Sequence, residues 1–141
     1  MERFRKLPRI YFRNTHGIIL TYDISIRDSF LHLDDHLHQI HESTDFQPKI
    51  ILVGHKADLE SQRKISFEEG MNFAQNHNLM FIEASAKQYI NIENIFNSLT
   101  AEILNTPTLV NRSLKLQNNS LRPNNQIKPF LFKKYLTKCY K

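Results

Sequence analysis

The chain has 141 residues, 40% hydrophobic and 23% charged, a composition that suits one globular domain with a packed core. Its single cysteine, Cys139, excludes an internal disulfide framework and fits a reducing compartment. The basic N-terminal residues lack the apolar stretch of a secretory signal. No apolar run approaches the roughly 20 residues of a membrane helix.

Charge is distributed unevenly along the chain. The net charge is +5, but residues 105–141 hold eight Lys or Arg and no Asp or Glu. The first 104 residues hold 11 basic and 14 acidic side chains. We therefore expect a domain over 1–104 and a flexible basic tail over 105–141, directed at an acidic partner such as a membrane surface. Nucleic acid is the less favoured partner, because nothing in the tail supplies base readout.

Strands and helices are predicted to alternate along the first 104 residues. Continuous apolar runs predict the strands, and apolar side chains repeating on one face predict the helices. In chain order these are strand 17–24, helix 28–41, strand 49–54, a helix from the capping box at 66–69 to about residue 76, strand 79–84 and helix 91–104. Unbroken apolar strands between amphipathic helices predict an α/β fold, with a parallel sheet covered by helices on both faces.

Polar residues follow the second and third predicted strands, at the sheet edge where ligands bind in such folds. The carboxylate of Asp58 can accept two parallel hydrogen bonds from the N1–H and exocyclic amine of guanine, a donor pair that adenine lacks. The stem of Lys56 can lie along the base, and backbone N–H groups after the third strand can donate to a base carbonyl. The candidate base-binding residues are His55, Lys56, Asp58, Ser85, Ala86 and Lys87.

The alternative for His-Lys-x-Asp by itself is an ordinary solvated loop, which is about as plausible as a binding function. The Ser-Ala-Lys turn after the next strand lowers the weight of that alternative, because two suitable segments then reach the same edge.

Five stretches, in this order and spacing, resemble the Rab branch of the small GTPases. They are ERFRKL, YFRNTHGIILTYDISIRDSF, ILVGHKADLESQRKIS, FIEASAK and NIENIF, and together they span residues 2 to about 104. The resemblance implies a Ras-like fold, binding of GTP or GDP with Mg²⁺, effector and regulator partners, and a role in vesicle traffic as a cytoplasmic protein peripheral on endomembranes.

The same resemblance assigns roles to individual positions. Lys56 and Asp58 take the place of the guanine-reading pair, and the 85–87 turn takes the place of the second base contact. His55 stands where the family usually has Asn, although some Rab members carry His there. Arg3, Phe4 and Arg5 match a mobile switch segment and are expected to contact partners.

The phosphate-binding part of the family site is not found in these 141 residues. None of the glycines, Gly17, Gly54 and Gly70, opens a Gly-x-x-x-x-Gly-Lys-Ser/Thr sequence, and Met1 stands in the place of the water-positioning Gln. We expect the C-terminal part of a Ras-like fold without its first strands, with no catalytic residue and no Mg²⁺ ligand, inactive as a GTPase by itself. The alternative is a catalytically inactive Rab-like interaction module with a membrane-directed basic tail.

Two further features carry weaker hypotheses. Cys139 is third from the C-terminal residue, which fits neither the four-residue prenylation box nor the paired cysteines of Rab endings, so lipidation there is a weak hypothesis. His32 and His36 have the i, i+4 spacing of a metal chelate, but a solvated polar helix face is favoured and no metal site is predicted.

Overall fold

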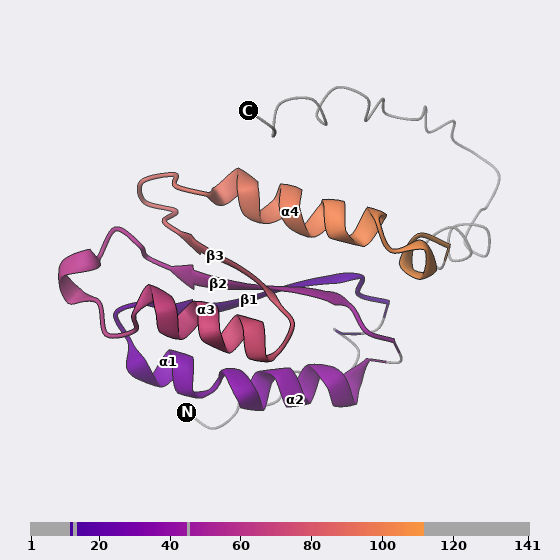
Figure 1. The fold of residues 1–141 in the computed structure, drawn as a ribbon, viewed down its shortest axis with the longest axis horizontal. Coiled ribbons are helices and arrows are strands. Elements are labelled where there is room, and N and C mark those ends of the chain that lie inside the picture. The colour runs from indigo at the N-terminus through magenta and orange to yellow at the C-terminus, as the bar shows by residue number, and fades with distance from the viewer. Residues whose placement is uncertain (1–11, 13, 45, 112–141) are drawn as a thin grey trace.

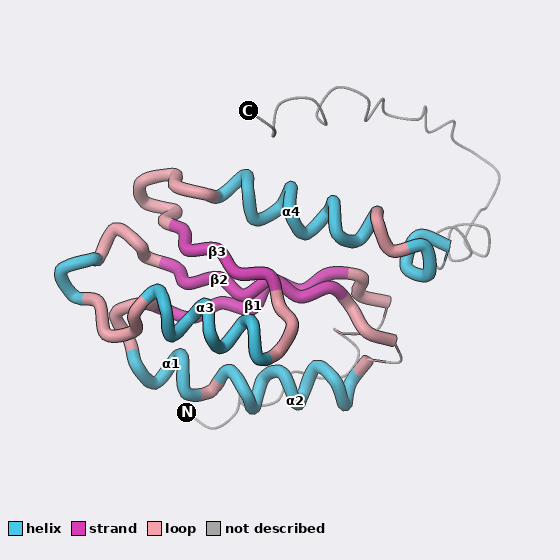
Figure 2. The backbone as a smooth tube through the Cα atoms, in the orientation of Figure 1, coloured by secondary structure: helices cyan, strands magenta, loops and turns pink. Residues whose placement is uncertain are grey.

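The structure, a computed structural model, describes residues 12, 14–44 and 46–111. One layer of strands lies between α1, α2 and α3 on one side and α4 on the other (Figure 1; Figure 2 shows the same backbone by element type). The elements are β1 (Gly17–Asp23), α1 (Arg27–Leu31), α2 (Leu33–Ser43), β2 (Lys49–His55), a 3₁₀ helix (Glu60–Gln62), α3 (Phe67–Asn76), β3 (Met80–Ala84) and α4 (Ile92–Leu104).

The described strands form one parallel sheet in the order β1-β2-β3. The register pairs Asp23 with His55 and His55 with Ala84. The carboxyl ends of all three strands are therefore neighbours along one edge, at the left of Figure 1. The loop after β2 therefore starts between the loops after β1 and β3.

Alternate residues of each strand point to opposite faces of the sheet, and each face has its own hydrophobic core. On one face, Leu20 and Leu52 pack with residues of α2 and α3. On the other face, Ile51 and Val53 pack with Ile95 and other residues of α4. The prediction of a parallel α/β sheet with helices on both faces is confirmed.

The predicted helix over 28–41 is two helices in the structure. The break is at His32, which has φ −87° and ψ 1° and whose backbone N–H donates to Phe30 rather than continuing the α-helical pattern. Its ring Nδ1 donates to the carbonyl oxygen of Asp28, 2.6 Å away. The apolar spacing continues through the break, because Phe30, on α1, and Leu33, on α2, contribute to the same core.

The predicted capping box is present. The Ser66 hydroxyl accepts from the Glu69 N–H at 3.1 Å, and the Glu69 carboxylate accepts from the Ser66 N–H at 3.1 Å. The other element bounds differ from the predicted ones by one residue at most. Within the described ranges, no helix has the length and apolar character that a bilayer crossing requires.

Candidate functional site

Asp58 lies in the loop after β2 and meets the turn after β3. The Ser85 hydroxyl donates to Asp58 Oδ1 at 2.5 Å, and Lys87 Nζ lies 4.0 Å from Oδ2. The side chain of Asp58 is 7% exposed. The Ser85 hydroxyl lowers the pKa of Asp58 below its usual value, so this carboxylate is ionised at neutral pH. An ionised carboxylate is an acceptor only, and each oxygen keeps a lone pair for a ligand donor.

The turn after β3 is closed by hydrogen bonds around Ser85. The Ser85 N–H donates to the Ile90 carbonyl at 3.1 Å, the Ile90 N–H donates back at 2.9 Å, and the Ser85 hydroxyl accepts from the Gln88 N–H at 3.1 Å. The backbone N–H groups of Ala86 and Lys87, both exposed residues, have no acceptor among the described residues. The turn thus offers two donors beside the Asp58 acceptor.

A backbone contact fixes the two loops relative to one another. The Ala57 N–H donates to the Ala84 carbonyl at 3.0 Å, and the Leu59 N–H donates to the Lys56 carbonyl at 2.9 Å. The first bond continues the pairing of β2 with β3 for one step past the end of β2. The structure therefore brings the two predicted segments, 55–58 and 85–87, to one edge of the sheet.

Lys56 has an unusual backbone conformation and a specific partner. Its φ is 62°, in the left-handed region that non-glycine residues rarely adopt. Its Nζ lies 2.6 Å from Asp23 Oδ2, and its side chain is 49% exposed. The ammonium is therefore held at the end of β1, while about half of the side chain faces solvent. Asp23 was not among the predicted site residues; its place at the end of the strand beside β2 was the signal that could have found it.

Asp23 is 4% exposed and its carboxylate is fully engaged. Burial by itself would raise the pKa of Asp23, but the hydrogen bond from Lys56 and two hydrogen bonds from Ser25 outweigh burial and lower the pKa to about 2. The Ser25 N–H and hydroxyl reach Oδ1 at 2.8 and 2.6 Å, which leaves Oδ2 to Lys56. Asp23 is therefore a charged acceptor at any physiological pH.

His55 is the last residue of β2 and is half-buried. Its carbonyl accepts from the Ile24 N–H at 3.2 Å, which extends the pairing of β1 with β2. For its imidazole, no hydrogen bond or ion pair is found within the part of the chain that the structure describes. His55 therefore lies where the loop that carries Lys56 and Asp58 begins, and no contact among the described residues defines a role for its ring.

Arg63 connects the loop after β2 to β3. Its Nη1 and Nη2 donate to the two carboxylate oxygens of Glu83 at 2.7 and 2.8 Å, and its Nε donates to both carboxylate oxygens of Glu60 at 2.9 Å. A further bond joins Nη1 to the Ile65 carbonyl at 3.0 Å. The side chains of Arg63 and Glu83 are 18% and 13% exposed. This contact fixes the loop that carries Asp58 to the strand that leads to Ser85.

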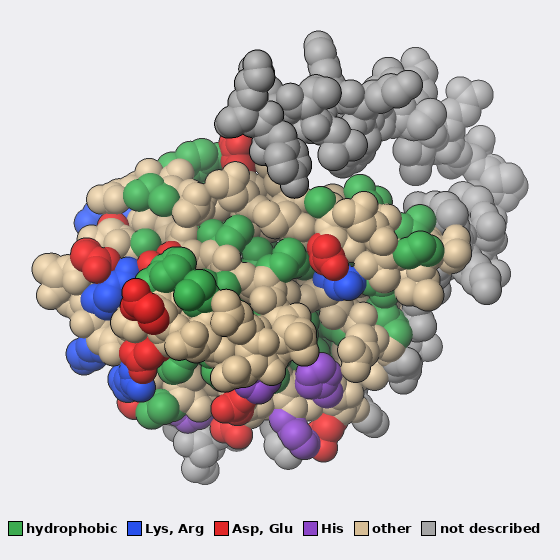
Figure 3. Space-filling view, viewed as in Figure 1, with side chains coloured by type: hydrophobic (Ala, Val, Ile, Leu, Met, Phe, Trp, Pro, Cys, Tyr) green, Lys and Arg blue, Asp and Glu red, His purple; other side chains and the backbone are tan. Residues whose placement is uncertain are grey.

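The remaining predicted positions and the predicted polar helix face lie elsewhere. Arg3, Phe4, Arg5 and Cys139 are outside the described residues. Histidine and acidic side chains gather over α2 (Figure 3). Across residues 12, 14–44 and 46–111, no group of three or more His, Cys, Asp or Glu is arranged to hold a metal ion.

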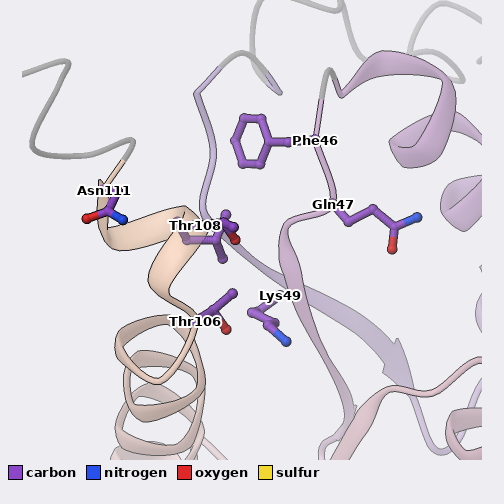
Figure 4. A pocket seen from close by; sticks show the side chains of 7 residues that line it. Phe46, Gln47, Lys49, Thr106, Thr108 and Asn111 are labelled. Carbon is purple, nitrogen blue, oxygen red and sulfur yellow. The ribbon is translucent and has the colours of Figure 1, made fainter.

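A pocket of about 680 Å³ lies at the opposite end of the sheet. Lys49, the first residue of β2, lines it together with Phe46, Thr106 and Asn111 (Figure 4). Lys49 Nζ lies 3.0 Å from a carboxylate oxygen of Glu102 on α4. Because its lining lies at the amino end of β2 and after α4, this pocket is separate from the candidate base site.

Comparison with known proteins gives a consistent assignment. A sequence model of the Ras family matches residues 1–105. Ras-related protein RABC1 of Arabidopsis thaliana is 42% identical over 110 residues, which cover 77% of this chain and 52% of that protein. Ras-related protein RABA4b of the same plant is 39% identical over 105 residues, 74% of this chain and 47% of that protein. The chain thus spans about half the length of these relatives.

Proposed function

The chain belongs to the Ras family, in its Rab branch of small GTPases, and from that premise we propose that segments 55–58 and 85–87 read the guanine base in a nucleotide-dependent switch of vesicle traffic. The observation that carries the proposal is the contact of Asp58 with Ser85, which holds an ionised acceptor next to two backbone donors.

The hydrogen-bond donors and acceptors of the two segments are complementary to guanine and not to adenine. Asp58 can accept from N1–H and the exocyclic amine of guanine, and the N–H of Ala86 or Lys87 can donate to the base carbonyl oxygen. Adenine presents a lone pair at N1 and an amine in place of that oxygen, so acceptor would face acceptor and donor would face donor. We expect guanine to be preferred by about tenfold or more in affinity.

The proposal covers the base-binding half of the site and not the phosphate-binding half. The 141 residues contain no Gly-x-x-x-x-Gly-Lys-Ser/Thr sequence. We therefore propose that the residues in hand supply base recognition, and we derive no hydrolytic step from them. A base pocket without phosphate contacts is expected to bind nucleotides in the millimolar range.

The domain organisation and membrane role are part of the proposal. Residues 1–104 form the GTPase-like domain, and the basic residues 105–141 direct it to an anionic endomembrane surface, which the absence of acidic residues in that segment supports. Effectors and regulators of the Rab type are the expected partners, with Arg3, Phe4 and Arg5 as contact residues.

The test is a titration of the ¹⁵N-labelled chain with GMP and AMP, followed by NMR. GMP should shift the amide signals of Asp58, Ala86 and Lys87 at lower concentration than AMP. Asp58→Asn should remove the difference between the nucleotides. Asp28→Asn, an exposed carboxylate on α1, is the matched control and should leave the difference intact. Equal binding of GMP and AMP by the unmodified chain would overturn the proposal.

A further inference from the structure

The carboxylate of Asp23 is built into the end of β1 by several contacts. Ser25 supplies two hydrogen bonds to Oδ1, and the Asp23 N–H itself donates to the Ser29 hydroxyl of α1 at 2.9 Å. Only Oδ2 is left for a charged partner, and Lys56 Nζ fills that position at 2.6 Å. The position of the acceptor is therefore fixed before the lysine reaches it.

The backbone conformation of Lys56 directs its side chain into this contact with Asp23. With φ at 62°, the residue leaves β2 in a left-handed conformation and sends its side chain back toward the end of β1. Both ends of the Lys56 side chain are then fixed, the Cα by the loop and the ammonium by Asp23. The methylene groups are therefore held between these two points, and the side chain remains 49% exposed. A fixed, exposed methylene chain is a suitable wall for a flat aromatic ring.

We propose that Asp23 is a positioning residue of the guanine site, an inference that rests on the proposed function. Asp23 holds the Lys56 stem so that the stem forms one wall for the purine ring. Asp23 then contributes to affinity for any purine, whereas Asp58 contributes to the choice of guanine over adenine. The two acids have different roles because the Asp23 carboxylate is held by Lys56 and Ser25, while the Asp58 carboxylate is proposed to face the base edge.

Asp23→Asn separates these tasks with little change of shape. The amide oxygen can keep both bonds from Ser25, but the amide nitrogen would face the Lys56 ammonium, donor against donor, and release it. We expect the affinities for GMP and for AMP to fall by the same factor, about threefold to tenfold, with their ratio unchanged. In a Lys56→Met background, Asp23→Asn should cause no further loss of affinity, which a merely structural role would not produce.

A second readout reports the contact without nucleotide. Acetylation by an amine-reactive reagent, followed by mass spectrometry, measures how fast each lysine reacts. Lys56 should react several-fold faster in Asp23→Asn than in the unmodified chain, while exposed Lys87 should react at an unchanged rate. Asp28→Asn should alter neither rate.

The outcomes separate this inference from the proposed function. Unchanged GMP affinity in Asp23→Asn, an unchanged Lys56 rate, or a further loss in the Lys56→Met background would overturn the role of Asp23 and leave guanine reading in place. Failure of the unmodified chain to prefer GMP would overturn both. If Asp23→Asn does not fold, acetylation of the unmodified chain is the test. Lys56 should then be acetylated more slowly than Lys87, and more slowly still when GMP is bound. Equal acetylation rates of Lys56 and Lys87 would overturn the inference.

Discussion

Replacing Arg63 by Met removes the guanidinium that joins the loop after β2 to β3, while its apolar stem is kept. In the unmodified protein Arg63 holds both carboxylate oxygens of Glu83, both of Glu60 and the carbonyl of Ile65. Met can make none of these bonds. Glu83, whose side chain is 13% exposed, would be left as a largely buried carboxylate without its partner.

The size of the effect follows from how exposed each partner is. Glu60 is 70% exposed, so water replaces Arg63 there and the loss is small. Breaking a fully buried ion pair costs about 3–5 kcal/mol, and the partial exposure of the Arg63–Glu83 pair reduces this to about 2–4 kcal/mol. Small domains have an unfolding free energy of only about 5–15 kcal/mol, so the loss is easily measured.

Urea unfolding followed by circular dichroism measures the change. Arg63→Met should lower the unfolding free energy by about 3 kcal/mol, and Arg63→Lys by about half of that, since one ammonium cannot reproduce the two parallel bonds to Glu83. Lys64→Met, the exposed neighbour, is the matched control and should change little. If Arg63→Met were no more destabilising than Lys64→Met, the role given to this contact would be refuted.

Three further predictions concern the other buried polar groups. The pKa of Asp23 is lowered to about 2 in the folded protein, so its ionised form contributes roughly 2 kcal/mol to the unfolding free energy above the unfolded pKa near 4. This contribution is lost as the pH falls toward 2. Acid unfolding of Asp23→Asn, followed by circular dichroism, should lack this part of the pH dependence. Tyr22→Phe should keep or raise the unfolding free energy, by up to about 1 kcal/mol, because the buried Tyr22 hydroxyl has no hydrogen-bond partner among the described residues; a loss above about 1 kcal/mol in urea unfolding would contradict this. Ser85→Ala should raise the pKa of Asp58 in a ¹³C carboxyl titration and weaken GMP binding; an unchanged titration would show that the Ser85 hydroxyl does not hold this carboxylate ionised.

The sequence was sufficient for most of the helices and strands and for bringing the two candidate segments to one edge of the sheet. Strands buried on both faces are continuous apolar runs, so 49–54 could be identified without any structure. Parallel topology then requires the loops after β2 and β3 to leave the same edge, which is why segments 55–58 and 85–87 could be placed together in advance.

The contacts that complete the site were beyond sequence reasoning. The pair Asp23–Lys56 depends on the register of β1 with β2 and on the left-handed backbone of Lys56, and neither is encoded in residue spacing. The bond from Arg63 to Glu83 joins residues 20 positions apart, with α3 between them in the chain. The helix break at His32 was not predicted, because the spacing of apolar residues continues unchanged from α1 into α2.

The decisive measurement is the affinity of the unmodified chain for GMP and for the N1-methylated form of GMP. Methylation at N1 removes the donor that Asp58 is proposed to accept, while the ring, the ribose and the phosphate stay the same. We expect the unmodified chain to bind GMP at least about tenfold more tightly than the methylated nucleotide, and we expect Asp58→Asn to reduce this difference in affinity. Equal affinity of the unmodified chain for both nucleotides would mean that Asp58 does not face the Watson–Crick edge of the base.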